Sequence, residues 1–494
     1  MKSLIKIGLT VLTFMFSSCL DKYPDNAILD GEAIESVSEA NQAVIGIYSA
    51  YRSSALHSGY LTLLPDIQCD LVYAVEGFSN TYSDIWRWEI LSNNREIEAV
   101  YAALYSVIGR CNYFFENIVK LENSLVDDEQ ISELQDLKGE VYFARALAYS
   151  ELIKCFCKAY EPHTADQDLG VALITSYYNP ERMIRSSIKD SYEFVLSDLM
   201  KAEEMVELEN TNNSAYITKS TVRALIARVY LYMQNWEGAR DYATKVIDDK
   251  YLALSSASEK FTSDMSYYDY MWNYDAGFEI IWKVGFTTTS YGGALGRVFL
   301  NYDYISYKPD YVPGNWALGL YDSNDLRAKS FFAQVTTGYA HGLTCPVLIK
   351  YNGNVDFRKQ NILHVNMPKV FRLSEQYLIR AEAYCRLNQF GLAGKDISKL
   401  RTARYTTYGN ASIDSNNWLD VISEERVREL FMEGFRLHDL KRWHKGFERK
   451  PQLHTVNAGN SLKIAADDPL FVWPIPQHEL DAPGSEMQPN ESNK

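Results

Sequence analysis

Two stretches of the chain carry the same order of small and aromatic residues, and every matched position recurs 154 residues later. In 221–246 the matched positions are Ala227, Tyr230, Trp236, Ala239, Ala243 and Val246. In 377–400 they are Ala381, Tyr384, Phe390, Ala393, Ile397 and Leu400. This spacing is typical of a helix–turn–helix repeat of ~34 residues. Small residues let two antiparallel helices approach closely, and the aromatic rings fill the gaps between them. The sequence therefore predicts helical hairpins.

The N-terminus has the features of a targeting segment. Lys2 and Lys6 supply positive charge, 4–16 is an apolar run, and Ser17 and Ser18 precede Cys19. The run is shorter than the ~20 residues that a membrane-spanning helix needs. Small residues before a cysteine favour a bacterial lipoprotein signal. The alternative is an ordinary secretory signal with an incidental cysteine. We interpret 1–18 as a lipoprotein signal peptide and 19–35 as a lipid anchor at Cys19 with its tether.

Charge and cysteine usage exclude several classes of function. The formal net charge of −15 argues against a nucleic-acid partner and against a basic membrane-binding surface. It also disfavours a strongly acidic polysaccharide as ligand, unless a local patch reverses the sign. The six cysteines after Cys19 are scattered and contain no CxxC pair, which favours buried free thiols over disulfides or a metal site. We expect no cofactor and no metal.

The helical pattern is interrupted once, over a long central segment. From 251 to 369 the chain is rich in Gly, Asn, Asp, Ser and aromatic residues, with short strands predicted at Glu279–Val284 and Val347–Tyr351. Long loops inside a compact fold tend to be functional. The prediction is a mainly α fold. A helical part at 36–250 and another at 370–494 supply tetratricopeptide-like hairpins, and 251–369 is a loop-rich, aromatic-rich subdomain with few short strands. The last part ends in an extended Trp473-Pro-Ile-Pro476 segment.

Several motifs point to one known family. They include Glu279-Ile-Ile-Trp282, the charged stretch from Glu424 to Trp443, and the Trp473–Pro476 segment near the end. With these, the chain resembles the outer-membrane lipoproteins of the SusD/RagB kind from starch-utilisation systems. The resemblance implies a surface-exposed, lipid-anchored protein of the outer membrane. Such a protein captures oligosaccharides or polysaccharide and delivers them to a partner TonB-dependent, SusC-like transporter, without catalysis.

Aromatic residues of the loop-rich regions are the candidate ligand contacts. A sugar ring offers an apolar face to a flat aromatic side chain and hydroxyls to Asp, Asn or Arg. The resemblance implies that two zones, 53–94 and the central insert, converge on one face. Burial remains the commoner fate of any single aromatic residue, and Trp282 is expected in the core. The candidates are Asp70, Trp86, Trp88, Trp272, Tyr291 and Trp316.

The predicted helix Glu424–Trp443 carries two carboxylates that could suggest catalysis. Glu429 and Glu433 are spaced as a carboxylate pair for acid–base chemistry. Arginines lie beside both, which keeps the acids ionised and favours structural ion pairs such as Glu424–Arg428, Glu433–Arg436 and Asp439–Arg442. No GxSxG, HExxH or phosphate-binding loop occurs. We predict that the protein is not an enzyme.

Three functions remain to be distinguished by experiment. The first is glycan capture for a transporter. The second is a non-glycan structural or peptide-binding scaffold that docks and gates the transporter, because tetratricopeptide-like hairpins often hold peptides or partner proteins. The third is a glycoside hydrolase, which would require release of reducing ends by the pure protein.

Overall fold

The computed structural model describes residues 33–211, 214–339, 342–408 and 410–493. The predicted signal peptide and the lipidation site Cys19 lie outside these residues, as does all but the end of the tether. No helix in the described ranges is both long and apolar enough to cross a bilayer.

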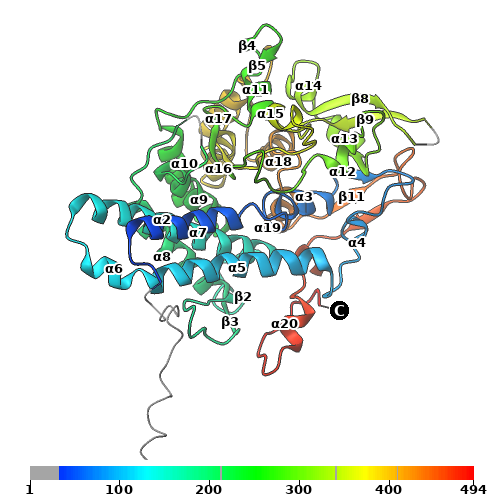
Figure 1. The fold of residues 1–494 in the computed structure, drawn as a ribbon. Helices are drawn as coiled ribbons and strands as arrows, with labels where there is room; N and C mark the ends of the chain where they lie inside the picture. The colour runs from blue at the N-terminus through cyan, green and yellow to red at the C-terminus, as the bar shows by residue number, and fades with distance from the viewer. Residues whose placement is uncertain (1–32, 212–213, 340–341, 409, 494) are drawn as a thin grey trace, which may run out of the picture.

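A layer of long helices forms the base of the molecule in Figure 1. At its centre is α7 (Asp128–Phe156), which packs against α2 (Val37–Ala50), α5 (Arg95–Asn117) and α8 (Ile188–Met205). Every residue from Phe143 to Ile153 is buried. Side-chain caps begin all four of these helices, since Ser36, Asn94, Asp127 and Ser187 each accept a hydrogen bond from a first-turn backbone N–H. A short α6 (Val119–Ser124) follows α5.

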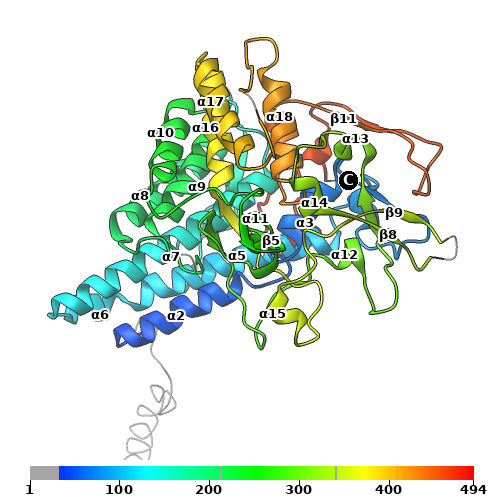
Figure 2. The same ribbon diagram turned by 90° about the horizontal axis from the view of Figure 1, so that it is seen from above.

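The two predicted hairpins are confirmed, and they lie side by side. The first is α9 (Lys219–Tyr232) with α10 (Trp236–Ile247), and the second is α16 (Leu373–Arg386) with α17 (Phe390–Thr402). In Figure 2 they stand next to each other, and α10 packs on α16. Apolar residues from both hairpins, four of them alanines, make their shared core: Ala227, Leu231, Ala239, Ala243, Ile379 and Ala383. Segments separated by the whole insert thus form one helical array.

The strands of the described residues are short and pair in twos, all antiparallel. The pairs are β1 (Val72–Ala74) with β7 (Tyr311–Pro313), β2 (Leu169–Ala172) with β3 (Arg185–Ser187), β4 (Lys260–Thr262) with β5 (Met265–Ser266), β6 (Ile280–Lys283) with β10 (Lys369–Arg372), β8 (Phe332–Thr336) with β9 (Thr344–Leu348), and β11 (Phe447–Arg449) with β12 (Leu462–Ile464). The first predicted strand is β6, and the second, β9, begins three residues earlier than expected.

The remaining helices are short and punctuate the loop-rich regions. They are α3 (Tyr60–Ile67), α4 (Ser83–Trp86), α11 (Tyr267–Tyr274), α12 (Arg297–Leu300), α13 (Asn315–Leu318), α14 (Arg327–Phe331), α15 (Val355–Arg358), a 3-10 turn at Pro469–Phe471 and α20 (Gln477–Asp481).

One helix prediction is wrong. The segment 424–443 is not a continuous helix but α18 (Trp418–Glu429) and α19 (Arg436–Arg442), separated by a six-residue break. Met432 and Gly434 in the break have φ of +58° and +84°. A Cβ on Gly434 would lie 2.3 Å from the carbonyl oxygen of Leu61. Gly434 is therefore required where the chain turns against α3.

Most buried apolar side chains belong to two large hydrophobic cores. The larger surrounds α7 and includes Trp282 and Trp473, both fully buried, as predicted for Trp282. The second combines side chains of 63–86, of the insert and of the α18–α19 break, among them Ile67, Trp86, Tyr268, Phe331 and Phe431. The two loop-rich regions therefore share one core, although more than 150 residues separate them in sequence.

Candidate functional site

Two predicted tryptophan platforms of the first loop-rich region are buried. Trp86 is 4% exposed, its indole N–H donates to the Val72 carbonyl at 3.2 Å, and the Arg449 guanidinium lies 4.7 Å from its ring centroid. Trp88 is 8% exposed and its indole N–H donates to Asp468 at 3.0 Å. Neither ring offers a free face to a sugar, because distant parts of the chain cover both.

Trp272 is also part of the core, on α11. It is 4% exposed, and three cations surround its ring: Lys350 at 4.3 Å, Lys369 at 4.5 Å and Arg372 at 5.3 Å from the centroid. This arrangement places cation–π contacts on the ring where a sugar would have to stack. The ring packs inside the molecule and not on its surface.

Asp70 and Trp316 come together, but their polar groups bind within the protein. Asp70 is buried and forms a two-point ion pair with Arg436, with both N–O distances 2.9 Å. The indole N–H of half-buried Trp316 donates to the Asp70 carbonyl at 2.6 Å, and the Arg436 guanidinium lies 5.3 Å from its ring. Sequence analysis thus identified two neighbours whose side chains stabilise each other.

Tyr291 is the predicted candidate that stands most open to solvent, at 46% exposure. Directly after it, Gly292 and Gly293 run against the segment 52–58. A Cβ would lie 2.5 Å from the Arg52 carbonyl oxygen at Gly292 and 2.4 Å from that of Ser58 at Gly293. These glycines let the insert approach the first loop-rich region closely, and a cavity opens beside this contact.

The cavity has a volume of about 430 Å³ and is built from both loop-rich regions. One wall comes from 54–63 and 79–82, and the opposite wall from 293–310. Two half-buried rings, Tyr60 and Tyr82, line it and meet edge to face with centroids 5.8 Å apart. The remaining polar lining consists of hydroxyls, one amide and two charged groups: Ser54, Ser58, Ser79, Thr81, Asn301, Arg297 and Asp310.

Asp310 joins the two walls of this cavity. Its backbone N–H donates to the Val298 carbonyl at 2.8 Å. Its carboxylate accepts hydrogen bonds from the Ser79 N–H at 2.7 Å and from the Ser79 hydroxyl at 3.0 Å. The Tyr311 hydroxyl also donates to the Thr81 carbonyl at 2.6 Å. The loop that carries Tyr82 is therefore held by the insert, and the cavity is preformed.

Sequence reasoning missed Tyr60 and Tyr82 as lining residues. Burial raises the pKa of both hydroxyls, so each stays protonated at neutral pH and can donate a hydrogen bond. Tyr82 also adopts a left-handed φ of +55°, which is uncommon for a bulky residue. A signal was available for Tyr82, because Ser79 to Asp84 contains polar turn-forming residues on both sides of the ring.

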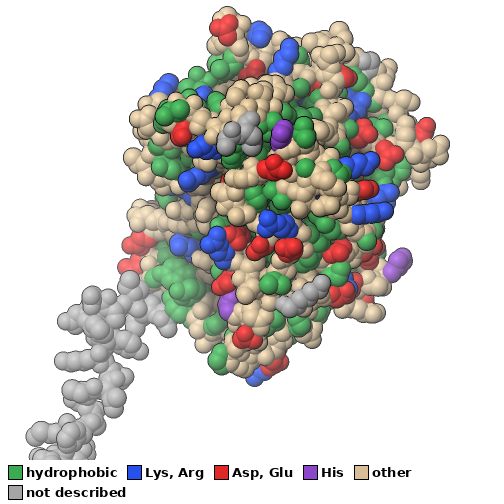
Figure 3. All heavy atoms as spheres, turned by 90° about the vertical axis from the view of Figure 1, so that its right-hand side faces the viewer, with side chains coloured by type: hydrophobic (Ala, Val, Ile, Leu, Met, Phe, Trp, Pro, Cys, Tyr) green, Lys and Arg blue, Asp and Glu red, His purple; other side chains and the backbone are tan. Residues whose placement is uncertain are grey.

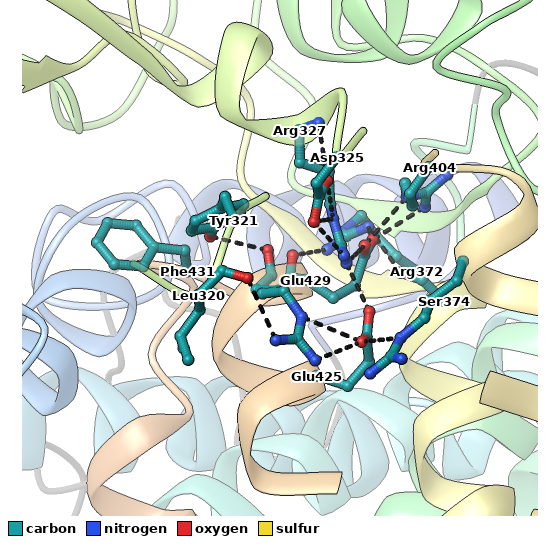
Figure 4. Close-up of polar contacts among 12 residues, drawn as sticks. Leu320, Tyr321, Asp325, Arg327, Arg372, Ser374, Arg404, Glu425, Glu429 and Phe431 are labelled. Carbon is teal, nitrogen blue, oxygen red and sulfur yellow. Dashed lines mark hydrogen bonds and ion pairs between the residues drawn. The ribbon is translucent and has the colours of Figure 1, made fainter. Parts of the chain in front are cut away.

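Glu429 lies in a buried ion-pair network between α18, β10 and the insert (Figure 4). Its carboxylate accepts hydrogen bonds from Arg327 at 3.0 Å, Arg372 at 2.8 Å and Arg404 at 2.9 Å. Burial alone raises the pKa of a carboxyl group, but Arg404 and Arg372 outweigh it and hold the pKa of Glu429 well below its usual value. A carboxylate held ionised in this way cannot act as a general acid.

Glu433 also has a structural role, but its partners are Lys350 and Arg372 and not the expected Arg436. It accepts hydrogen bonds from Lys350 at 2.6 Å and from Arg372 at 2.7 Å, whereas Arg436 turns to Asp70. The predicted Glu433–Arg436 pair is wrong because the helix breaks between them. Its pKa is lowered, because Arg372 and Lys350 outweigh burial. Two other expected pairs form: Glu424–Arg428 at 3.5 Å and Asp439–Arg442 at 2.9 Å.

The described ranges contain no cluster of metal-ligating side chains. No group of three or more His, Cys, Asp or Glu side chains there is placed to hold a metal ion. The cysteines at 69, 111, 155, 157, 345 and 385 are buried free thiols, as predicted. Burial raises the pKa of these thiols, for example that of Cys155 to about 12, so they are poor nucleophiles.

Comparison with known proteins gives a consistent result. A family profile described as "Starch-binding associating with outer membrane" matches residues 19–231, and one described as "SusD family" matches residues 339–491. SusD-like protein P25 of Formosa agariphila is 22% identical over 88% of this chain and 89% of its own length. A SusD superfamily crystal structure from Bacteroides thetaiotaomicron is 25% identical, with a TM-score of 0.78 over 93% of this chain and 99% of its own. Surface glycan-binding protein A from Bacteroides fluxus has the same fold, with 18% identity and a TM-score of 0.68 over 92% of this chain and 99% of its own.

Proposed function

The chain belongs to the SusD/RagB family, and from this premise we propose that it captures a glycan at the outer membrane and delivers it to a partner TonB-dependent transporter. In this proposal Cys19 carries the lipid anchor, and the protein performs no catalysis. The ionised states of Glu429 and Glu433 support the last point, because neither carboxyl group is free to give or take a proton.

The observation that carries the proposal is the cavity between the two loop-rich regions. It combines the half-buried rings Tyr60 and Tyr82 with hydroxyl, amide and charged groups, and its volume of about 430 Å³ suits a short oligosaccharide segment. The C–H face of a sugar ring packs on a tyrosine ring, and its hydroxyls exchange hydrogen bonds with Ser58, Ser79 or Asn301. Tyr291 at the adjacent surface supplies a further ring for a longer chain.

Binding is tested with the soluble form that begins at Leu20, on native gels cast with plant, fungal and host polysaccharides. We expect at least one polymer to retard the protein. The double variant Tyr60→Ala, Tyr82→Ala should weaken the affinity about tenfold or more, because two stacking surfaces are lost. Tyr216→Ala is the matched control, since Tyr216 is 59% exposed and lies outside the cavity lining.

Two results would count against this choice of site. Unchanged retardation of the double variant would move the site away from the cavity. No retardation by any polymer would favour the alternative function, a scaffold that docks and gates the transporter without holding glycan itself.

Anchoring and delivery require the full-length protein in its own cell. Cys19→Ala should abolish labelling by a fatty acid and release the protein from the membrane fraction. Co-purification of the wild-type protein with a β-barrel transporter would support delivery. A chain that stays membrane-bound and unlabelled after the substitution would refute anchoring through Cys19.

A further inference from the structure

Arg297 is an unpaired cation in the wall of the cavity. It begins α12, lines the cavity and is exposed. In the part of the chain that the structure describes, its guanidinium makes no hydrogen bond and no ion pair with a protein group. The five N–H donors of a guanidinium group are therefore available to a ligand.

Other arginines, such as Arg52 and Arg436, differ from Arg297 in having protein partners. Arg52 donates to the Gly285 carbonyl at 2.9 Å and to the Ser290 hydroxyl at 2.8 Å. Arg436 is held by Asp70 with both distances at 2.9 Å. These arginines join segments that are distant in sequence, whereas the Arg297 side chain makes no such contact with a described residue.

Asp310, the other charged lining residue, forms no ion pair with Arg297 among the described residues. Asp310 is 6% exposed, and both its carboxylate oxygens already accept hydrogen bonds from Ser79. The positive charge of Arg297 is felt nearby: burial lowers the pKa of His364, and the Arg297 charge lowers it further, although a hydrogen bond with the Tyr302 N–H opposes both. In the cavity wall, burial raises the pKa of the Tyr82 hydroxyl and the Arg297 charge partly opposes this rise, so the charge of Arg297 also acts beside Tyr82.

We propose that the cavity selects an acidic glycan, whose carboxylate or sulfate group binds the guanidinium of Arg297. This inference rests on the proposed glycan-binding function and names its substrate class. Arg forms two parallel hydrogen bonds with carboxylate or sulfate oxygens, which supplies both affinity and orientation. Tyr60 and Tyr82 then pack on the ring that carries the anionic group.

The net charge of −15 does not oppose this assignment. At physiological ionic strength the screening length is about 8 Å, so charges elsewhere on the surface contribute little inside the cavity. Asp310 keeps its negative charge, but Ser79 holds its carboxylate, so Arg297 is the charged lining group whose donors are free for a ligand. An acidic polymer is therefore attracted locally although the protein as a whole is acidic.

The test measures affinity for polymers that differ only in charge. Titration calorimetry compares polygalacturonate with its methyl-esterified form, and a sulfated galactan with the unsulfated polymer. We expect the wild-type protein to bind one charged polymer about tenfold to a hundredfold more tightly than its neutral counterpart, with affinity falling as salt rises. A preference for polygalacturonate over its ester identifies a carboxylate ligand, and a preference for the sulfated galactan over the unsulfated one identifies a sulfate ligand.

Variants connect the preference to Arg297. Arg297→Gln should reduce affinity for the charged polymer to that for the neutral one, and Arg297→Lys should give an intermediate value because it keeps the charge but loses the planar donors. The control is Arg182→Gln, which removes an exposed arginine paired with Glu486. Circular dichroism checks that each variant is folded.

Three outcomes would overturn the inference. A wild-type protein that binds neutral and charged polymers equally, or that prefers neutral ones, lacks the selectivity. A preference that survives Arg297→Gln is not due to this residue. In both cases glycan binding itself stands, whereas absence of binding to every polymer refutes the proposed function together with the inference.

Discussion

At the scale of single residues, one acidic side chain, Glu429, is shared by three buried arginines. Arg327, Arg372 and Arg404 all reach its carboxylate, and all four side chains are 1% exposed or less. Such a group holds α18, β10 and the insert in one arrangement, since each arginine comes from a different segment. Burying any one of these charges alone would be costly, and the opposite charges of the network offset that cost for each other.

Neutralising Glu429 should therefore destabilise the protein strongly. In Glu429→Gln three buried guanidinium groups lose a shared anion, and we expect the free energy of unfolding to fall by about 3–5 kcal/mol. Urea denaturation measures it. Glu424→Gln on the same helix is the control, because Glu424 is 51% exposed and 3.5 Å from Arg428, and it should cost less than about 1 kcal/mol. Equal losses in the two variants would contradict the role given to the network.

Acid should remove a second buried interaction in a defined pH window. Burial raises the pKa of Glu382, but the charge of Arg442 and its hydrogen bonds outweigh burial and lower the pKa to about 2, against an ordinary value near 4.5. A carboxyl group with a lowered folded-state pKa adds stability above its unfolded-state value and loses it as pH falls. Glu382→Gln should thus be much less stable than wild type at pH 6, and the difference should shrink between about pH 4.5 and 2. A constant difference in urea titrations across that window would disprove this.

Exposure of individual aromatic residues was the hardest property to predict. Trp88 lies edge to face with Phe447 and Phe471, whose ring centroids are 5.4 and 5.3 Å away, and its N–H binds Asp468. These partners are more than 350 residues distant in the chain, so no local pattern reveals them. Tyr82 differs because its polar sequence neighbours do indicate an open loop.

At the scale of elements, local spacing was a good guide wherever packing follows helical periodicity. The turns of both hairpins fall where the repeated pattern places them, between Tyr232 and Trp236 and between Arg386 and Phe390. The break between α18 and α19 was not predicted, because it depends on the backbone of α3 that lies against Gly434. A tertiary contact there overrides a helical pattern of charges.

Substituting Gly434 in this break should destabilise the protein, and Gly391 in α17 offers a control for the same substitution. Gly434→Ala places a Cβ 2.3 Å from the Leu61 carbonyl oxygen in a residue with φ of +84°. Strain of this kind costs about 1–3 kcal/mol, and the backbone clash adds to it, so we expect the unfolding midpoint in urea to fall clearly. Gly391→Ala in α17 meets no atom within 4 Å and should be neutral or stabilising by up to about 1 kcal/mol. A neutral Gly434→Ala would mean that the turn can relax.

At the scale of the whole molecule, the distribution of charge can be followed over one face of the surface. The face shown in Figure 3 has acidic and basic side chains interspersed with uncharged surface. Selectivity for a charged ligand therefore has to come from a local group, as argued for Arg297, and not from the overall field. The same dispersion leaves no broad basic surface for nucleic acid on this face.

The insert 251–369 illustrates how the parts depend on one another. Its core includes Trp86 and Ile67 from the first loop-rich region and Phe431 from the break after α18. Its strand β7 pairs with β1, and β6 pairs with β10, whose residues lie almost entirely beyond the insert. Excised from the chain, the insert would lose these partners and expose the apolar side chains that they cover.

We therefore expect residues 251–369 expressed alone to be unfolded, and the chain from Leu20 to unfold in one cooperative transition. Without β1 and the side chains at 63–86, the insert cannot bury enough apolar surface to offset the entropy of ordering its loops. Circular dichroism and calorimetry on both chains measure this. A cooperative melting transition in the excised segment would show that the insert is an autonomous domain, and two separate transitions in the full chain would show that the cores unfold independently. A single transition would mean that the cavity forms only when the whole chain is folded.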